Sequence, residues 1–169
     1  MKLILSDHSL SLPPEQGDIR YIDLSGLKIA NCVGCFGCWT KTPGRCVIRD
    51  DATRVYPLIA QSDQLLYVSR IFCGGYDVPM KTMLERAIPI QQAFIRIHHG
   101  ETHHVQRQVV PKKAVIVGYG ASSPQEEALF RQLIARNTYN MAIEETEVIC
   151  CEESQVEAIV KERVEAWKN

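Results

Sequence analysis

The chain has 169 residues, with 19 lysines and arginines against 20 aspartates and glutamates, which gives a net charge of −1. This length suits one domain, residues 1–169, whose core is large enough to need no disulfide scaffold. Near-neutral charge without a basic stripe argues against a nucleic-acid partner, and the lack of a long apolar run argues against a membrane segment. The N-terminal residues do not resemble an export signal, so we expect a cytoplasmic protein with reduced thiols.

Short apolar runs and helical apolar spacing alternate along the chain. The runs predict buried strands, and apolar residues three or four positions apart predict the helices between them. The predicted strands are residues 2–6, 19–24, 64–69, 112–118 and 145–150. The predicted helices begin near Asp51, Pro79, Pro124 and Ser154, with Ser123 as the N-cap of the third. Pro57, inside the first of them, must either begin that helix or kink it.

This alternation favours right-handed crossovers and a five-stranded parallel sheet with helices on both faces. Five strands fit a flavodoxin-like, three-layer α/β fold with strand order 2-1-3-4-5. The first helix of that fold is reduced or missing, because only residues 7–18 separate the first two strands and Pro13, Pro14 and Gly17 disfavour a helix. Ligands of such sheets bind outside the carboxyl ends of the strands. That rule selects the loops 7–12, 70–76 and 119–123.

Four cysteines, Cys32, Cys35, Cys38 and Cys46, lie close together in the sequence. Their C-x2-C-x2-C spacing with a more distant fourth thiol is similar to the ligation of a 4Fe-4S cluster, because two intervening residues let successive sulfurs face one small core. A tetrahedral zinc site is a second reading. In a third reading the thiols hold no metal and pack as small hydrophobes around glycine turns, or form a redox-active pair.

Residues 32–46, followed by Asp50-Asp51, resemble the NAD(P)H-dependent FMN reductase and iron-sulfur flavoprotein group of the flavodoxin superfamily. Residues 69–75 and 79–81 are similar to the loop and helix that hold the flavin ring in that group, and 118–120 extend the match. The resemblance implies an FMN-dependent oxidoreductase, with NAD(P)H as co-substrate and a small-molecule or protein electron acceptor. A 4Fe-4S flavoprotein in electron transfer is a further alternative.

The resemblance also implies a set of site residues. The implied cofactor-binding residues are Ser6, Ser9, Arg70, Ile71, Phe72, Cys73, Gly74, Gly75, Gly118, Tyr119 and Gly120. The implied cluster ligands are Cys32, Cys35, Cys38 and Cys46. No side chain is indicated as catalytic, which is expected where the flavin supplies the chemistry.

The resemblance is weakest where the phosphate of the cofactor should bind. An FMN phosphate in this fold normally lies at the N-terminus of the first helix, on free backbone N–H groups. Here that helix is lacking and Asp7 brings negative charge, although Ser6, Ser9, Ser11 and His8 can donate hydrogen bonds. We therefore expect weaker or differently arranged binding. The alternative function is a flavodoxin-like scaffold or interaction subunit that has lost FMN binding.

Loss of the first helix would leave apolar sheet surface near the first two strands, so we expect a homodimer or larger homo-oligomer. Residues 89–111 form a long connection, which is typical of a lid or a pocket wall. Its histidines at positions 98, 99, 103 and 104 are either a transition-metal site or ordinary loop histidines. Arg70, where related flavoproteins tend to have proline, either faces the flavin or an acidic substrate, or forms a surface ion pair with Asp77.

Overall fold

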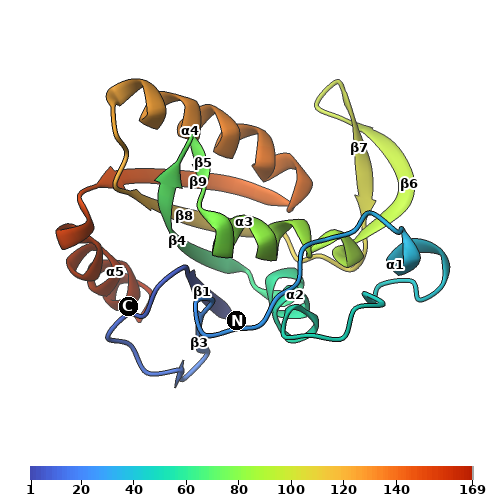
Figure 1. Ribbon diagram of the computed structural model, residues 1–169, viewed down its shortest axis with the longest axis horizontal. Coiled ribbons are helices and arrows are strands. Elements are labelled where there is room, and N and C mark those ends of the chain that lie inside the picture. Colours follow the sequence, from blue (N-terminus) through green and yellow to red (C-terminus); the bar gives the residue numbers. More distant parts are fainter. Residues whose placement is uncertain (169) are drawn as a thin grey trace.

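The centre of the molecule is a parallel β-sheet in a computed structural model that describes residues 1–168 (Figure 1). Its parallel strands lie in the spatial order β3-β1-β4-β8-β9, which is the order 2-1-3-4-5 expected from the sequence. The strands are β1 (Lys2–Ser6), β3 (Ile19–Asp23), β4 (Gln64–Phe72), β8 (Lys112–Tyr119) and β9 (Ile143–Cys151). Two short antiparallel strands, β2 (Glu15–Gln16) and β5 (Gly75–Tyr76), pair with β3 and β4. The flavodoxin-like fold is confirmed.

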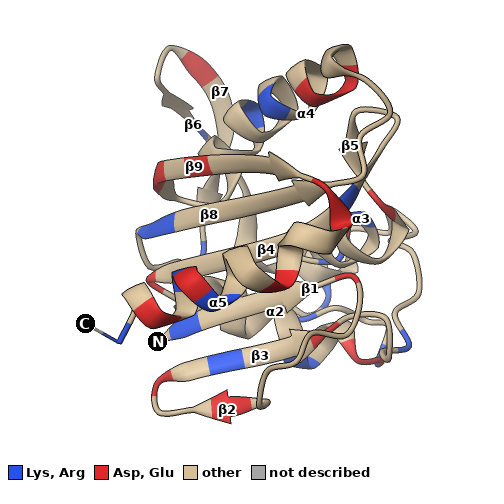
Figure 2. Cartoon of the chain, turned by 90° about the vertical axis from the view of Figure 1, so that its left-hand side faces the viewer, with Lys and Arg blue, Asp and Glu red and all other residues tan. Residues whose placement is uncertain are grey.

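Helices cover both faces of this sheet. They are α1 (Gly37–Thr40), α2 (Ala52–Gln61), α3 (Val78–Glu85), α4 (Pro124–Asn137) and α5 (Val156–Ala166), with 3-10 turns η1 (Ile88–Ile90), η2 (Thr138–Asn140) and η3 (Glu153–Gln155). One core cluster joins α2, α3 and α4 to strand residues such as Leu5 and Leu65. The other joins α5 to Ile4 and Leu66, which alternate with them along the same strands. In Figure 2 α5 lies in front of the sheet.

Local sequence explains most of the helix boundaries. The Ser123 side chain accepts the Glu126 N–H at the start of α4, as an N-cap should, and Asp77 accepts the Val78 N–H at the start of α3. Pro57 lies inside α2 instead of beginning it. No helix within residues 1–168 is long and apolar enough to cross a membrane.

No helix follows β1, as expected, but the exposed apolar sheet surface that we expected beside the first two strands is not there. Residues between β1 and β3 form a loop whose Leu10 is 5% exposed, and Ile4 and Ile19 are also buried. Leu10 packs in the same cluster as Val156 and Val160 of α5. Loop and helix together therefore cover this face without a partner, so the original reason for expecting a homo-oligomer was wrong.

Residues 89–111 are not an irregular connection, as the sequence suggested, but mainly a β-hairpin. Its strands β6 (Gln91–His98) and β7 (Glu101–Gln106) form a separate two-stranded antiparallel sheet. The hairpin stands away from the central sheet (Figure 1). Phe94, Ile95 and Ile97 are 72%, 65% and 74% exposed on it. A new apolar surface thus lies on the hairpin, far in sequence from where one was expected.

Candidate functional site

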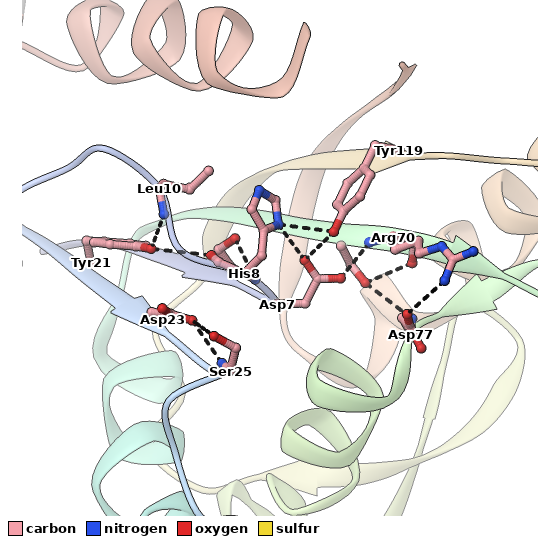
Figure 3. A network of polar contacts seen from close by, with 11 residues as sticks. Asp7, His8, Leu10, Tyr21, Asp23, Ser25, Arg70, Asp77 and Tyr119 are labelled. Atoms are coloured by element: carbon pink, nitrogen blue, oxygen red, sulfur yellow. Dashed lines mark hydrogen bonds and ion pairs between the residues drawn. The ribbon is translucent and has the colours of Figure 1, made fainter. Parts of the chain in front are cut away.

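The loops after β1, β4 and β8 meet at the carboxyl edge of the sheet, around the carboxylate of Asp7 (Figure 3). The Asp7 side chain is only 4% exposed. Its Oδ2 accepts the backbone N–H of Arg70 at 2.6 Å, and its Oδ1 accepts the hydroxyl of Tyr119 at 3.0 Å. His8 Nδ1 lies 2.9 Å from the same Oδ1 and 3.0 Å from the Tyr119 oxygen. One buried carboxylate therefore ties three strand ends together.

The protonation state of Tyr119 follows from this setting. Burial, followed by the negative charge of Asp7, raises the pKa of Tyr119 well above its ordinary value. The tyrosine therefore stays neutral at physiological pH and donates its proton to the carboxylate. The His8 ring packs edge-on against the Tyr119 ring at 5.1 Å between centroids, which fixes the imidazole beside the pair.

Arg70 contributes its backbone, not its charge, to the centre of this network. The guanidinium is 54% exposed and lies 3.9 Å from the Asp77 carboxylate, as the surface ion-pair reading of the sequence predicted. Such exposed pairs contribute little to stability. Figure 3 shows the Arg70 side chain directed toward Asp77 and away from Asp7.

The loop after β1 does not fit an FMN phosphate. A phosphate needs free backbone N–H groups, but in this loop the His8 N–H is given to Ser6 Oγ, the Leu10 N–H to the Tyr21 hydroxyl and the Ser11 N–H to Glu157. Ser6 is fully buried. Of the residues that the sequence placed around the phosphate, Ser9 and Ser11 are exposed there.

A second carboxylate, which the sequence did not single out as a site residue, holds the loops predicted to contact the flavin ring. Glu126 Oε1 accepts the Gly74 N–H at 3.1 Å, and its Oε2 accepts the Ser122 N–H at 2.7 Å and hydroxyl at 2.6 Å. Hydrogen bonds from the Ser122 hydroxyl and N–H and then from Gly74 lower the pKa of Glu126 to about 2. The sequence signal for Glu126 was its position three residues after the N-cap Ser123.

The remaining predicted ring contacts are divided between the core and the surface. Ile71 is buried in the core, and a Cβ on Gly118 would lie 2.7 Å from Phe130, so these two residues serve packing. Phe72 is 53% exposed and Cys73 is also exposed, at a turn where Cys73 and Gly74 both have positive φ angles. The structure thus brings Arg70, Tyr119 and Ser6 together around Asp7, and leaves Phe72 and Cys73 outside that network.

The cysteine loop lies elsewhere, anchored by a buried arginine. Cys32 and Cys35 are exposed, while Cys38 and Cys46 are partly buried. Burial, followed by the charges of the neighbouring thiols, raises the pKa of Cys38. Arg86 Nη2 donates to Cys46 Sγ at 3.4 Å. Within residues 1–168 no group of three or more His, Cys, Asp or Glu side chains is arranged to hold a single metal ion, so the thiols as they lie do not fit a zinc site.

The hairpin histidines do not converge on a metal position either. His103 lies between Asn140 and Glu101, with its ring nitrogens 3.1 Å from each of their side-chain oxygens. His98 and His99 pack against each other and against Tyr139. In the described part of the chain these imidazoles make hydrogen-bonding and aromatic contacts, and no three metal-binding side chains are grouped to hold a metal ion.

The protein is a flavodoxin-like α/β protein, as its strand order, the helices on both faces and the loops at the carboxyl edge show. Solved structures with this fold include the FMN-dependent NADH-azoreductase of Bacillus anthracis in complex with FMN, with a TM-score of 0.61, 10% identity and coverage of 98% of this chain and 95% of that one. The NAD(P)H:quinone oxidoreductase of Methanothermobacter marburgensis gives a TM-score of 0.53 at 10% identity, covering 89% and 85%.

The chain is also distantly homologous to archaeal iron-sulfur flavoproteins. One from Methanocaldococcus jannaschii is 26% identical over 92 residues, which is 54% of this chain and 47% of the relative. One from Archaeoglobus fulgidus is 32% identical over 72 residues, 43% of this chain and 32% of the relative. Each match spans less than half of the relative. No protein-family model matches the chain.

Proposed function

We propose that this chain is a flavodoxin-like interaction subunit whose own FMN phosphate site is closed. The observation that carries the proposal is the buried Asp7 carboxylate, which takes the Arg70 N–H and the Tyr119 hydroxyl at the carboxyl edge. An FMN phosphate brings roughly two further negative charges at neutral pH. Repulsion by the carboxylate and the loss of free N–H donors both oppose binding there.

The partner that we propose is a second copy of this chain, contacted through the β6–β7 hairpin. A two-stranded hairpin is only marginally stable in water, and its free strand edges are ready to pair. Packing of the hairpin faces of two copies around a twofold axis covers Ile95 and Ile97, which lie on one face of β6 and are otherwise exposed. A net charge of −1 does not oppose self-association.

Light scattering tests the dimer. Wild type should have twice the mass of the chain, and Ile97→Lys should be monomeric because it places a charge in the interface. Val33→Lys is the matched control, because Val33 is 71% exposed on the cysteine loop, and it should remain dimeric. A monomeric wild type, or a dimeric Ile97→Lys protein, would overturn this part of the proposal.

The second candidate is an FMN-dependent oxidoreductase that transfers electrons from NAD(P)H to a small-molecule or protein acceptor. It is favoured by Phe72 and Cys73, which remain exposed beside the carboxyl edge where a flat ring can stack. Bound there, FMN would supply the hydride chemistry. The chain's part would be to position the ring through the Cys73–Gly74 turn, with Asp7 displaced from the phosphate position.

Absorbance and FMN titration separate the two candidates. Protein purified without oxygen should be colourless, and added FMN should keep its fluorescence. In the Asp7→Ser variant, which removes the carboxylate, weak quenching of FMN fluorescence should appear. Flavin bands in the protein as isolated, or tight quenching by wild type, would establish the oxidoreductase instead, and a broad brown shoulder would establish a cluster on the four cysteines. Circular dichroism verifies that the variant is folded.

A further inference from the structure

A cavity of about 820 Å³, the α3–α4 cavity, lies between helices α3 and α4 against the sheet face opposite to α5. Tyr67 and Ile116 of the central strands line it, together with Leu84 of α3 and Ile134 of α4. Its volume is in the range of sites for small organic ligands, and most of its lining is apolar. The Asp7 network does not line it, but Phe72, Cys73 and Gly75 do, so the cavity adjoins the position expected for a flavin ring and lies away from the position expected for the phosphate.

Two buried polar atoms of the lining lack hydrogen-bond partners. Tyr67 is 2% exposed, and its hydroxyl has no partner within residues 1–168. The same holds for Nδ1 of His104, which lines the α3–α4 cavity from the hairpin. Buried hydroxyls are nearly always hydrogen-bonded in folded proteins, because the group has given up its water. Two such atoms in the lining of one cavity indicate that a ligand supplies the missing partners.

The lining specifies the chemistry of that ligand. Tyr67, Tyr76 and Phe72 offer aromatic rings, which favour a flat ring system. The charged residues of the lining, Lys81 and Glu85, lie 4.0 Å apart as an ion pair, so the cavity presents no net charge to a ligand. Burial raises the pKa of Tyr67 far above its ordinary value, so its hydroxyl stays protonated and can donate.

We propose that the α3–α4 cavity binds a neutral, largely apolar ring compound whose carbonyl oxygen accepts a hydrogen bond from the Tyr67 hydroxyl. This site shares Phe72, Cys73 and Gly75 with the position expected for a flavin ring, so it rests on the proposed absence of FMN there. It goes beyond the proposed function, because an interaction subunit with such a site would carry or sense a small molecule.

The test uses the fluorescent dye N-phenylnaphthylamine, which brightens in apolar cavities, and two competitors that differ in one oxygen. Acetylnaphthalene carries a carbonyl and ethylnaphthalene does not. Wild type should bind the dye and prefer acetylnaphthalene. The Tyr67→Phe protein should lose that preference, with acetylnaphthalene weakened about 2- to 10-fold, as expected for one neutral hydrogen bond, and ethylnaphthalene unchanged. Equal affinities of wild type for the two competitors, or an unchanged preference in Tyr67→Phe, would overturn the proposal.

A second variant keeps the test independent of substitutions in the core. Val78 lines the α3–α4 cavity and is 66% exposed, so Val78→Trp should fill the entrance without disturbing the fold, and should abolish dye binding. Val33→Trp, the control on the cysteine loop, should bind the dye like wild type. If Val78→Trp binds the dye normally, the dye lies elsewhere. If Val78→Trp turns a dimer into a monomer and wild type binds no dye, a second copy covers the cavity and the small-molecule proposal falls.

Discussion

Replacing Arg86 by methionine should destabilise the protein more than any surface change, because this arginine is the buried anchor of the cysteine loop. Arg86 is 1% exposed. Its guanidinium donates to both carboxylate oxygens of Asp50, at 2.6 and 2.8 Å, and to the carbonyl oxygens of Ala30 at 2.6 Å and Ile48 at 3.3 Å. Methionine keeps much of the side-chain volume but none of these donors.

The expected loss of stability follows from the Asp50 carboxylate that Arg86→Met leaves without its cation. The Asp50 side chain is only 15% exposed, so its charge would stay partly buried without its cation. Breaking a buried ion pair in this way costs about 3–5 kcal/mol, which for a chain of this size lowers Tm by roughly 6–20 °C. Arg86→Lys keeps the charge but loses the planar fork, so its loss should be smaller.

Urea unfolding monitored by circular dichroism measures the change in the free energy of unfolding. Arg54→Met is the control, because Arg54 is 73% exposed in its ion pair with Asp51 and should contribute less than about 1 kcal/mol. An Arg86→Met protein that loses less than about 1 kcal/mol would refute the reasoning, since a buried charge would then have been left unpaired at no cost.

The same ion pair predicts how stability depends on pH. Burial acts to raise the pKa of Asp50, but hydrogen bonds from Arg86 and from the Ala30 N–H outweigh it and the pKa lies below its ordinary value. A carboxyl whose pKa is lowered by folding stabilises the protein above its unfolded pKa, and that contribution is lost as pH falls through the folded value. The free energy of unfolding of wild type should therefore approach that of Asp50→Asn as pH falls. A difference between the two that grew on acidification would contradict the ion pair.

Three smaller changes test the loops at the carboxyl edge. The Glu126→Gln protein should lose less stability than wild type between about pH 4.5 and pH 2, because the pKa of Glu126 is about 2 when folded and its contribution disappears over that window; parallel pH profiles in urea would contradict this. Gly74→Ala should destabilise by about 1–3 kcal/mol, because its Cβ would lie 2.4 Å from Leu129 at a positive φ, while Gly26→Ala, with open space, should change little. Ser123→Ala should cost about 1 kcal/mol in thermal unfolding through loss of the α4 cap, and Ser123→Asp should restore it; equal losses would show that the cap is not the cause.

The fold could be predicted from the sequence because each central strand is a short apolar run and each main helix has a local start signal. The hairpin could not, because apolar and polar residues alternate only over residues 95–98, Phe94 is out of phase with them, and the strands pack on no core that would impose a longer alternation. Prolines on both sides of this segment made an irregular connection the simpler prediction.

The sequence predicted where the candidate site lies, but not which of its residues are hydrogen-bonded to one another. The rule for parallel sheets selected the right loops, and Asp7 was recognised as an unfavourable charge for a phosphate. Sequence alone did not reveal that Asp7 bonds to Arg70, 63 residues later, and to Tyr119, 112 residues later. Such pairings depend on strand register, which spacing along the chain does not encode.

Asp7 also acts as a competitor that the protein carries within its own chain. A covalently held group meets its partners at an effective concentration far above that of a free solute. An anion from solution must displace Asp7 from Tyr119 and from the Arg70 N–H before it can bind. Occupancy of this edge therefore depends on displacement of the Asp7 side chain more than on the supply of ligand.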